Sequence, residues 1–324
     1  MNQDDFRFRA IFMPRATKKL IAVMTNPKIR FVHYTTADSF TKMLSSGSIW
    51  MRNARGMNDL SEVANGHVRI RTALYSDGRI DRLRAALNAI HPGLTPSDEI
   101  LSLVDGHARS MLHDTYITCV SEHDPREDLI GRLSMWRAYS QGSVGVGVVL
   151  NTEAFKSETD VLGVYSSPVS YLTDAEIAAD IEQIITNIDS ERQWLATQDP
   201  QLIVNWGFSM FLFGLTCLKH PGFAEELEWR IIHNSTLHQS TEVKPEIVTL
   251  NGIPQRIYKI PLKDYPERGF VGASPNRLIE RVIIGPSNYG PIVRQALIDS
   301  MAAAGVHSPE NRIINSDIPL RVSH

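Results

Sequence analysis

Apolar and polar positions alternate near the start of the chain as a strand requires. Within residues 28–34, one face would carry Ile29, Phe31 and His33, and the other Arg30, Val32 and Tyr34. Thr35 or Thr36 can cap a following helix that ends near Gly47, and residues 48–52 predict a second short strand. The chain is therefore expected to open as strand, helix, strand.

The spacing of apolar residues, every second position in a strand and every third or fourth in a helix, predicts the remaining elements. Strands are expected at 116–121, 143–150, within 161–171, and at 226–233, 246–250, 256–262, 281–285 and 312–315. Helices are expected within 61–88 and at about 96–113, 129–139, 173–188, 202–218 and 292–304. The helix at 202–218 is the most apolar, but small and polar residues interrupt it and it is shorter than the ~20 residues of a membrane span. We expect a buried core helix there.

The strands come in separated clusters and do not alternate strictly with helices. This pattern favours an α+β fold with a central mixed or antiparallel sheet and large helical insertions. We expect an N-terminal extension over residues 1–28 and a single α+β domain over 29–324, with a helical insertion at about 61–113.

Composition narrows the class of protein. The 324 residues are 43% hydrophobic and carry a formal net charge of -3, so non-specific attraction to nucleic acid or to an anionic membrane is not expected. Cys119 and Cys217 both lie in apolar runs, which indicates buried thiols in a reducing compartment. No secretion signal is recognisable at the N-terminus. We therefore expect a cytoplasmic protein with no membrane association.

Familiar nucleotide and hydrolase motifs are missing from the sequence. It has no P-loop, no Gly-x-Ser-x-Gly elbow and no His-Glu-x-x-His pair. Gly142, Gly145 and Gly147 lie before and inside an expected strand, whereas a dinucleotide loop joins a strand to a helix. Close strand packing is the simpler explanation of these glycines.

Residues 226–233 hold the most suggestive polar pattern. As a strand, this segment would place Glu226, Glu228 and Arg230 on one face. Repulsion between two neighbouring carboxylates should raise the pKa of one of them. Such a pair beside an arginine suits stabilisation of a sugar cation and activation of water or an acceptor. The competing interpretation is a solvated strand face with an ordinary ion pair.

Other candidates each have a structural explanation as well. His33 and Tyr34 end a strand, where sites are often built, but a lone histidine is commonly a satisfied structural residue. Trp136 and Tyr139 lie three apart on a helix, a spacing typical of core residues. Asn58 and Asp59 can begin a helix, with Asp59 and Glu62 forming a capping box.

The order of these segments resembles the bacterial domain-of-unknown-function family 2971 over about residues 30–286. The segments that carry the resemblance are Phe31-Val32-His33-Tyr34-Thr35, Ile49-Trp50, Met57-Asn58-Asp59 with Glu62, Cys119-Val120-Ser121, Met135-Trp136 with Tyr139 and Gly142, Lys219, Glu226, Glu228-Trp229-Arg230, and Ile284-Gly285-Pro286. That resemblance implies no established activity.

A more distant similarity, over about a third of the chain, is to ADP-ribosyltransferase folds. The His-Tyr-Thr strand, helix and Gly-Ser-Ile-Trp segment resemble the opening of those folds. The resemblance implies that His33 contacts the nicotinamide-side ribose, that Ser121 or Tyr139 lines the nicotinamide pocket, and that Glu228 is the catalytic glutamate, with Glu226 completing Glu-x-Glu. No phosphate-binding arginine is identified; the candidates are Arg30, Arg52 and Arg55.

Our first functional hypothesis is therefore an NAD-dependent ADP-ribosyltransferase or NAD glycohydrolase that acts as a bacterial toxin or phage-defence effector. NAD would be a co-substrate, no metal is expected, and the partners would be a protein or nucleic acid acceptor and an antitoxin or defence-system protein. The catalytic residues would be Glu228, Glu226 and His33; the substrate-binding residues would be Tyr34, Ser121, Trp136, Tyr139, Asn58, Asp59 and Arg230.

Two other classes remain open. One is a nucleotide-sensing or protein-interaction module without turnover, whose pocket would be formed by Trp136, Tyr139 and Trp229. The other is a metal-dependent nuclease with Asp59, Glu62 and Glu228 around Mg²⁺. The enzyme hypothesis depends on His33 and Glu228 facing one another across a ribose-sized pocket.

Overall fold

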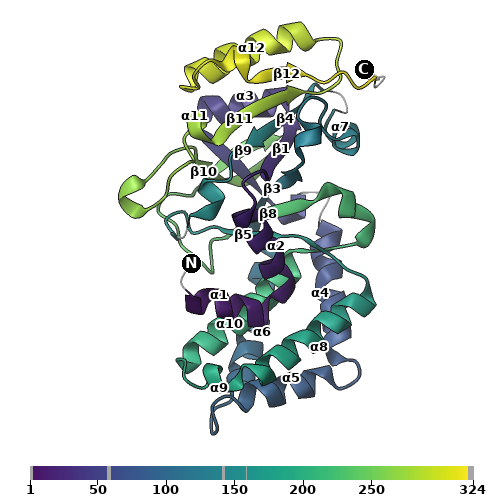
Figure 1. Ribbon diagram of the computed structural model, residues 1–324, viewed down its shortest axis with the longest axis vertical. Coiled ribbons are helices and arrows are strands. Elements are labelled where there is room, and N and C mark those ends of the chain that lie inside the picture. The colour runs from purple at the N-terminus through teal and green to yellow at the C-terminus, as the bar shows by residue number, and fades with distance from the viewer. Residues whose placement is uncertain (1–2, 57–59, 141–142, 158, 251, 320–324) are drawn as a thin grey trace. The chain divides into compact units, whose positions relative to one another are not determined.

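A computed structural model describes residues 3–56, 60–140, 143–157, 159–250 and 252–319, and for 60–65 it describes the backbone alone. The chain divides into two compact units, which we call the helical unit and the sheet unit (Figure 1). The helical unit comprises Met1–Ala22, Asn53–Thr115 and Ser167–Ala224. The sheet unit comprises Val23–Arg52, Tyr116–Ser166 and Glu225–His324.

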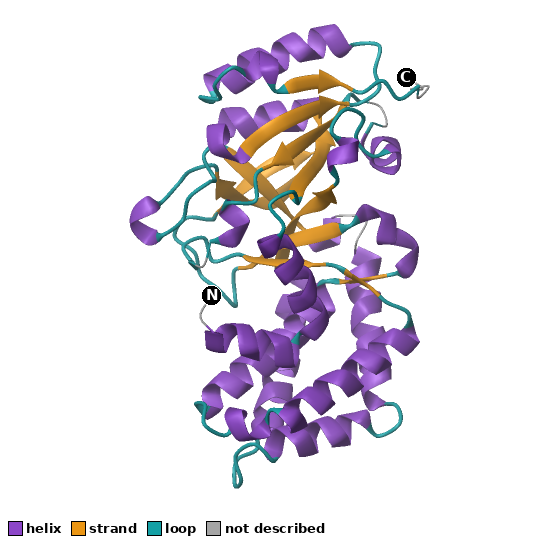
Figure 2. Ribbon diagram, in the orientation of Figure 1, coloured by secondary structure: helices purple, strands orange, loops and turns teal. Residues whose placement is uncertain are grey.

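The sheet unit is built around a ten-stranded mixed sheet (Figure 2). Its strands are β1 (Arg30–Thr36), β2 (Ser48–Asn53), β3 (Thr115–His123), β4 (Gly145–Leu150), β5 (Tyr165–Pro168), β8 (Glu228–Asn234), β9 (Lys244–Leu250), β10 (Ile253–Pro261), β11 (Ile279–Ile284) and β12 (Ile313–Asn315). The order is β12-β11-β4-β1-β3-β2-β10-β9, and β8 pairs with β3 and β5. Antiparallel pairing dominates, with β11 and β12 parallel. The predicted α+β class is confirmed.

Some helices of the sheet unit begin and end at recognisable capping residues. The described helices of this unit are α3 (Ala37–Ser46), α7 (Leu133–Tyr139), α11 (Pro275–Leu278) and α12 (Gly290–Ala303). At the start of α3 the Thr36 hydroxyl accepts a hydrogen bond from the Ser39 amide, and at its end Gly47 takes a left-handed conformation with φ of 58°. The strand–helix–strand order predicted for residues 28–52 is confirmed as β1, α3 and β2.

The helical unit holds the longer helices and a two-stranded sheet of β6 (Ser170–Tyr171) and β7 (Leu218–Lys219). Its helices are α1 (Gln3–Phe12), α2 (Pro14–Thr25, whose last turn crosses into the sheet unit), α4 (Leu60–Tyr75), α5 (Arg79–Asn88), α6 (Pro96–His113), α8 (Asp174–Ser190), α9 (Arg192–Leu195) and α10 (Pro200–Thr216). Thr173 and Glu176 form a reciprocal capping box at α8. Among the described residues, no helix is both long and apolar enough to cross a bilayer.

The structure differs from the sequence prediction at two places. Residues 1–28, expected as an extension, hold α1 and α2, and Phe8, Ile11 and Phe12 of α1 are buried in the helical core. The strand expected from residue 226 begins only at Glu228. The helices expected within 61–88 are present as α4 and α5, which are separated where the chain turns through residues with positive φ at Asp77 and Gly78. The single-domain assignment for 29–324 stays a prediction.

Candidate functional site

One face of the central strands is defined by two contacts of Trp229. Its ring lies 5.1 Å from that of Phe31 on β1, and its Nε1 donates a hydrogen bond of 2.9 Å to the Glu122 carboxylate on β3. Phe31 and Glu122 are also direct partners in the β1–β3 ladder. Because side chains alternate along a strand, Phe31, Glu122 and Trp229 share one face of the sheet.

The opposite face carries four of the predicted site residues, and we call it the Tyr34 face. Each of them lies an odd number of positions along its strand from Phe31, Glu122 or Trp229, and therefore points to the other side. They are Tyr34, Ser121, Glu228 and Arg230. The Glu122 amide donates to the Leu227 carbonyl at 2.9 Å, so the end of β3 lies beside the start of β8. The structure thus brings Ser121 and Glu228 together on one face.

Glu228 and Arg230 form a buried ion pair on this face. The Arg230 Nε donates to Glu228 Oε1 at 2.8 Å, and Arg230 and Glu228 are 0% and 5% exposed respectively. The competing interpretation of a solvated strand face is therefore wrong, although the ion pair that it expected is present. Removal of either partner of a buried ion pair leaves an uncompensated charge in the interior and strongly destabilises the fold.

Glu226 does not share the face with Glu228, which corrects the expected carboxylate pair. Glu226 ends the 3-10 segment Pro221–Glu226, before the strand begins. Leu227 between them has a φ of 47°, a conformation that is strained for a bulky side chain. This turn breaks the two-residue period that the sequence prediction assumed.

His33 lies on the face opposite to Glu228. It is two residues from Phe31 on an unbroken strand, whereas Glu228 is adjacent to Trp229, which contacts Phe31. Its Nδ1 donates to the Cys119 carbonyl at 2.8 Å, and burial lowers the pKa of the imidazole, with that hydrogen bond opposing the shift. The expected approach of His33 to Glu228 across one pocket is not found.

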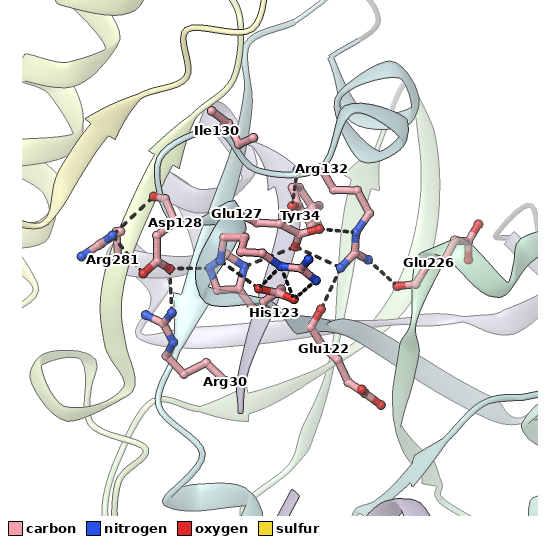
Figure 3. Close-up of polar contacts among 12 residues, drawn as sticks. Arg30, Tyr34, Glu122, His123, Glu127, Asp128, Ile130, Arg132, Glu226 and Arg281 are labelled. Atoms are coloured by element: carbon pink, nitrogen blue, oxygen red, sulfur yellow. Dashed lines mark hydrogen bonds and ion pairs between the residues drawn. The ribbon is translucent and has the colours of Figure 1, made fainter. Parts of the chain in front are cut away.

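Arg132, which the sequence prediction missed, organises the Tyr34 face (Figure 3). Its guanidinium binds the Glu127 carboxylate through two hydrogen bonds of 2.9 and 3.0 Å. It also donates to the backbone carbonyls of Glu122, Glu225 and Glu226 at 2.9 to 3.0 Å. The planar fork of an arginine suits such a set of acceptors. Arg132 therefore holds the backbone just before the strained turn at Leu227 and joins it to the end of β3.

Tyr34 is tied into the same arrangement. Its hydroxyl accepts a hydrogen bond of 2.9 Å from the Arg132 amide. Burial, together with the nearby charge of Glu127, raises the pKa of the Tyr34 phenol to about 12. Tyr139, which is exposed, places its ring 6.5 Å from that of Tyr34. Of the two aromatic residues on α7, Tyr139 is the one whose ring reaches solvent.

Trp136 is a core residue, which corrects its assignment to the substrate-binding residues. It is fully buried, and its Nε1 donates to the Ile130 carbonyl at 2.8 Å. A Cβ at Gly131 or Gly285 would come within 2.3 or 2.8 Å of the indole. Gly147 also packs closely against this ring. Close packing was the role expected for Gly147 from the sequence. Trp229, only 2% exposed, is not open to a ligand either.

Beside Arg132 lies a second charged cluster, centred on Asp128 (Figure 3). Asp128 Oδ1 contacts Arg30 Nη2 and His123 Nε2, each at 2.7 Å, and Arg281 lies 3.4 Å from its other oxygen. Burial raises the pKa of Asp128, but hydrogen bonds from His123 and Arg30 outweigh it and the net shift is downward. Arg30 also pairs with Glu280, so it is neutralised as a phosphate-binding candidate.

Two predicted site residues, Asn58 and Asp59, lie outside the described residues. Arg55 belongs to the helical unit and is exposed, whereas Arg52 belongs to the sheet unit. Within the described part of the chain, no group of three acidic, histidine or cysteine side chains could hold a metal ion.

Residues 135–231 match the model of a family described as a protein of unknown function (DUF2971). The predicted resemblance to this family is confirmed over that segment, which is shorter than the expected 30–286. The segment contains Trp136, Tyr139, Glu226, Glu228 and Arg230, whereas His33, Tyr34 and Ser121 precede it. The chain has no significant match among curated proteins or solved structures.

Proposed function

We propose that this protein cleaves the bond between nicotinamide and ribose in NAD, as an ADP-ribosyltransferase or NAD glycohydrolase, with Glu228 as the catalytic carboxylate. Nicotinamide would leave with the electrons of its bond to ribose C1′. A water or acceptor oxygen or nitrogen would then bond to C1′ and lose its proton. A macromolecular acceptor would make the protein a toxin or a defence effector.

The supporting observation is the position of Glu228. Its carboxylate is removed from bulk water, is held by Arg230 at 2.8 Å, and shares a face with Ser121 and Tyr34. A carboxylate fixed in a water-poor environment stabilises a developing sugar cation more strongly than a solvated one does. Arg132 and Leu227 fix the backbone just before it.

The proposed site differs from the sequence hypothesis in its residues. His33 is left out because it points to the other face of the sheet and bonds to Cys119. Glu226 and Trp136 are left out for the reasons given above. Among the described residues, the site then consists of Glu228 and Arg230 with Ser121, Tyr34 and Tyr139.

Incubation with NAD labelled in the nicotinamide ring, with and without protein and nucleic acid acceptors, tests the proposal. We expect release of nicotinamide, and at least ~100-fold less release by Glu228→Gln. His33→Gln is the matched control: once its folding is verified by circular dichroism, it should keep activity within about tenfold. No nicotinamide release with any acceptor, or equal loss in the two variants, would disprove the proposal.

A nucleotide-binding module without turnover is the second candidate. It is favoured by the ion pair of Glu228 with Arg230, because a buried carboxylate that binds an arginine can have a purely structural role. Thermal-shift measurements with NAD, ADP-ribose and other nucleotides separate the two, because a shift without nicotinamide release indicates binding alone. Nucleic acid cleavage abolished by EDTA would indicate the nuclease instead.

A further inference from the structure

The helical unit contains a pocket whose walls are almost entirely apolar. It has a volume of about 140 Å³ and lies among α1, α2, α4, α5, α8, α10 and the β6–β7 pair. Leu74 and Leu83 line one part of it, and Ile181, Ile184 and Phe211 another. All of its lining residues belong to the helical unit.

The chemistry of the walls decides what can occupy this space. A single water needs only roughly 15 Å³, so the pocket could hold several. Water at such a site also needs two to four polar partners. The uncharged polar side chains of the lining are Ser167 and Ser170, apart from the thiol of Cys217, and the Ser167 hydroxyl already donates to the Pro168 carbonyl. An apolar molecule suits these walls better than a water cluster does.

Size and flexibility set the class of molecule. A cavity of roughly 150 Å³ with aliphatic and aromatic walls accommodates a molecule such as benzene. Met13, Met210 and Cys217 contribute sulfur atoms to the lining, and methionine side chains adapt readily to different shapes. The pocket therefore fits a single small ring or a short alkyl group.

The charged residues of the lining argue for an uncharged ligand. They are Arg15 and Asp180, and they bind each other through two hydrogen bonds of 2.8 and 2.6 Å. Both side chains are partly exposed, so this pair lies where the lining meets solvent. A ligand carboxylate or ammonium would have to displace the existing partner of one of them.

We propose that this pocket is a binding site for a small, uncharged, apolar molecule, aromatic or alkyl, bound beside the Arg15–Asp180 pair. The inference is independent of the chemistry proposed for Glu228, because it uses other residues and another unit. It assigns the helical unit a role in ligand binding.

Toluene, benzoate and benzylamine form a matched series that tests the proposal on the full-length protein. We expect toluene to raise the melting temperature saturably, by about 2 °C near saturation, and to show saturation-transfer NMR signals. Benzoate and benzylamine should bind at least about tenfold more weakly, because burial of an unpaired charge is unfavourable. No saturable toluene binding, or tighter binding of either ion, would overturn the proposal.

Two variants that fill the space locate the binding. Ile181→Phe and Ser170→Leu place larger side chains at the lining, and each should reduce toluene affinity at least about tenfold. Gln183→Leu is the control, since it adds an apolar side chain to an exposed position of α8 outside the lining. Toluene binding that both filling variants retain would place the ligand elsewhere and overturn the assignment.

Discussion

Arg132 joins several segments of the chain around Tyr34. It joins the Glu127 carboxylate to three backbone carbonyls on two separate segments, and its own amide holds the Tyr34 hydroxyl. Only 7% of the residue is exposed, so each of these bonds replaces water that the buried group has lost. The strained conformation of Leu227 lies between the segments it holds and the strand of Glu228.

Arg132→Lys should therefore destabilise the protein by about 2 kcal/mol, because an ammonium keeps the charge but cannot reach a carboxylate and three carbonyls together. Urea unfolding followed by circular dichroism measures the change. Arg126→Lys is the matched control: Arg126 is 89% exposed and pairs only with Asp124 among the contacts described, so this substitution should leave the free energy of unfolding nearly unchanged. Equal losses in the two variants would show that the contacts of Arg132 do not stabilise the fold.

The residue scale also shows why the candidate site could be predicted only in part. Alternation assigns His33 to the face of Phe31 and Glu228 to the face opposite Trp229 from sequence alone. It cannot say whether the faces of two distant strands correspond, because that depends on pairing and register. The contact between Phe31 and Trp229 shows that these two residues lie on the same face of the sheet. His33 therefore lies on one face and Glu228 on the other.

At the scale of elements, prediction succeeded where periodicity and a cap agreed. The helix at 96–113 and the capping box of α8 were found as expected. Prediction failed at α1, where Phe6, Phe8, Ile11 and Phe12 do not form one clean apolar stripe, and Arg7 and Arg9 cover tryptophan rings of the helical unit. These cation–π contacts come from distant residues that no local pattern reveals.

Helices α6 and α10 approach so closely at Gly207 that a side chain there would press against α6. A Cβ on Gly207 of α10 would lie 2.4 Å from the Cδ1 of Ile100, a fully buried residue of α6. Gly207→Ala should therefore destabilise the protein by about 1 kcal/mol, even though alanine favours a helix more than glycine does. Ile100→Val removes the opposing methyl group and should cost about 1 kcal/mol alone.

The double variant makes this prediction specific to the contact. The methyl group that Gly207→Ala introduces can occupy the space left by Cδ1, so the double variant should be about 1 kcal/mol more stable than the sum of the single effects predicts. Gly106→Ala on α6 is the control, because nothing lies within 4 Å of the added atom; it should not destabilise the protein. Simple additivity in urea unfolding would contradict the proposed contact.

For the whole molecule, the open question is whether the two units unfold together. The chain passes between them at 22/23, 52/53, 115/116, 166/167 and 224/225. Each passage lies inside an element: α2, β2, β3, β5 and the 3-10 segment Pro221–Glu226. Independent domains are usually joined through exposed linkers with few contacts. The sequence could predict the elements, but not how they are shared between the units, because that depends on long-range packing.

We expect a single cooperative unfolding transition, since unfolding of either unit would interrupt elements that continue into the other. Differential scanning calorimetry tests this with variants that mark each unit, Gly207→Ala for the helical unit and Arg132→Lys for the sheet unit. If the prediction is right, each variant lowers the same melting temperature, and the calorimetric and van't Hoff enthalpies agree. Two transitions, each shifted by only one of the variants, would instead show two domains and contradict the single-domain assignment. The comparison does not depend on any activity, because both variants change stability through contacts within their own unit.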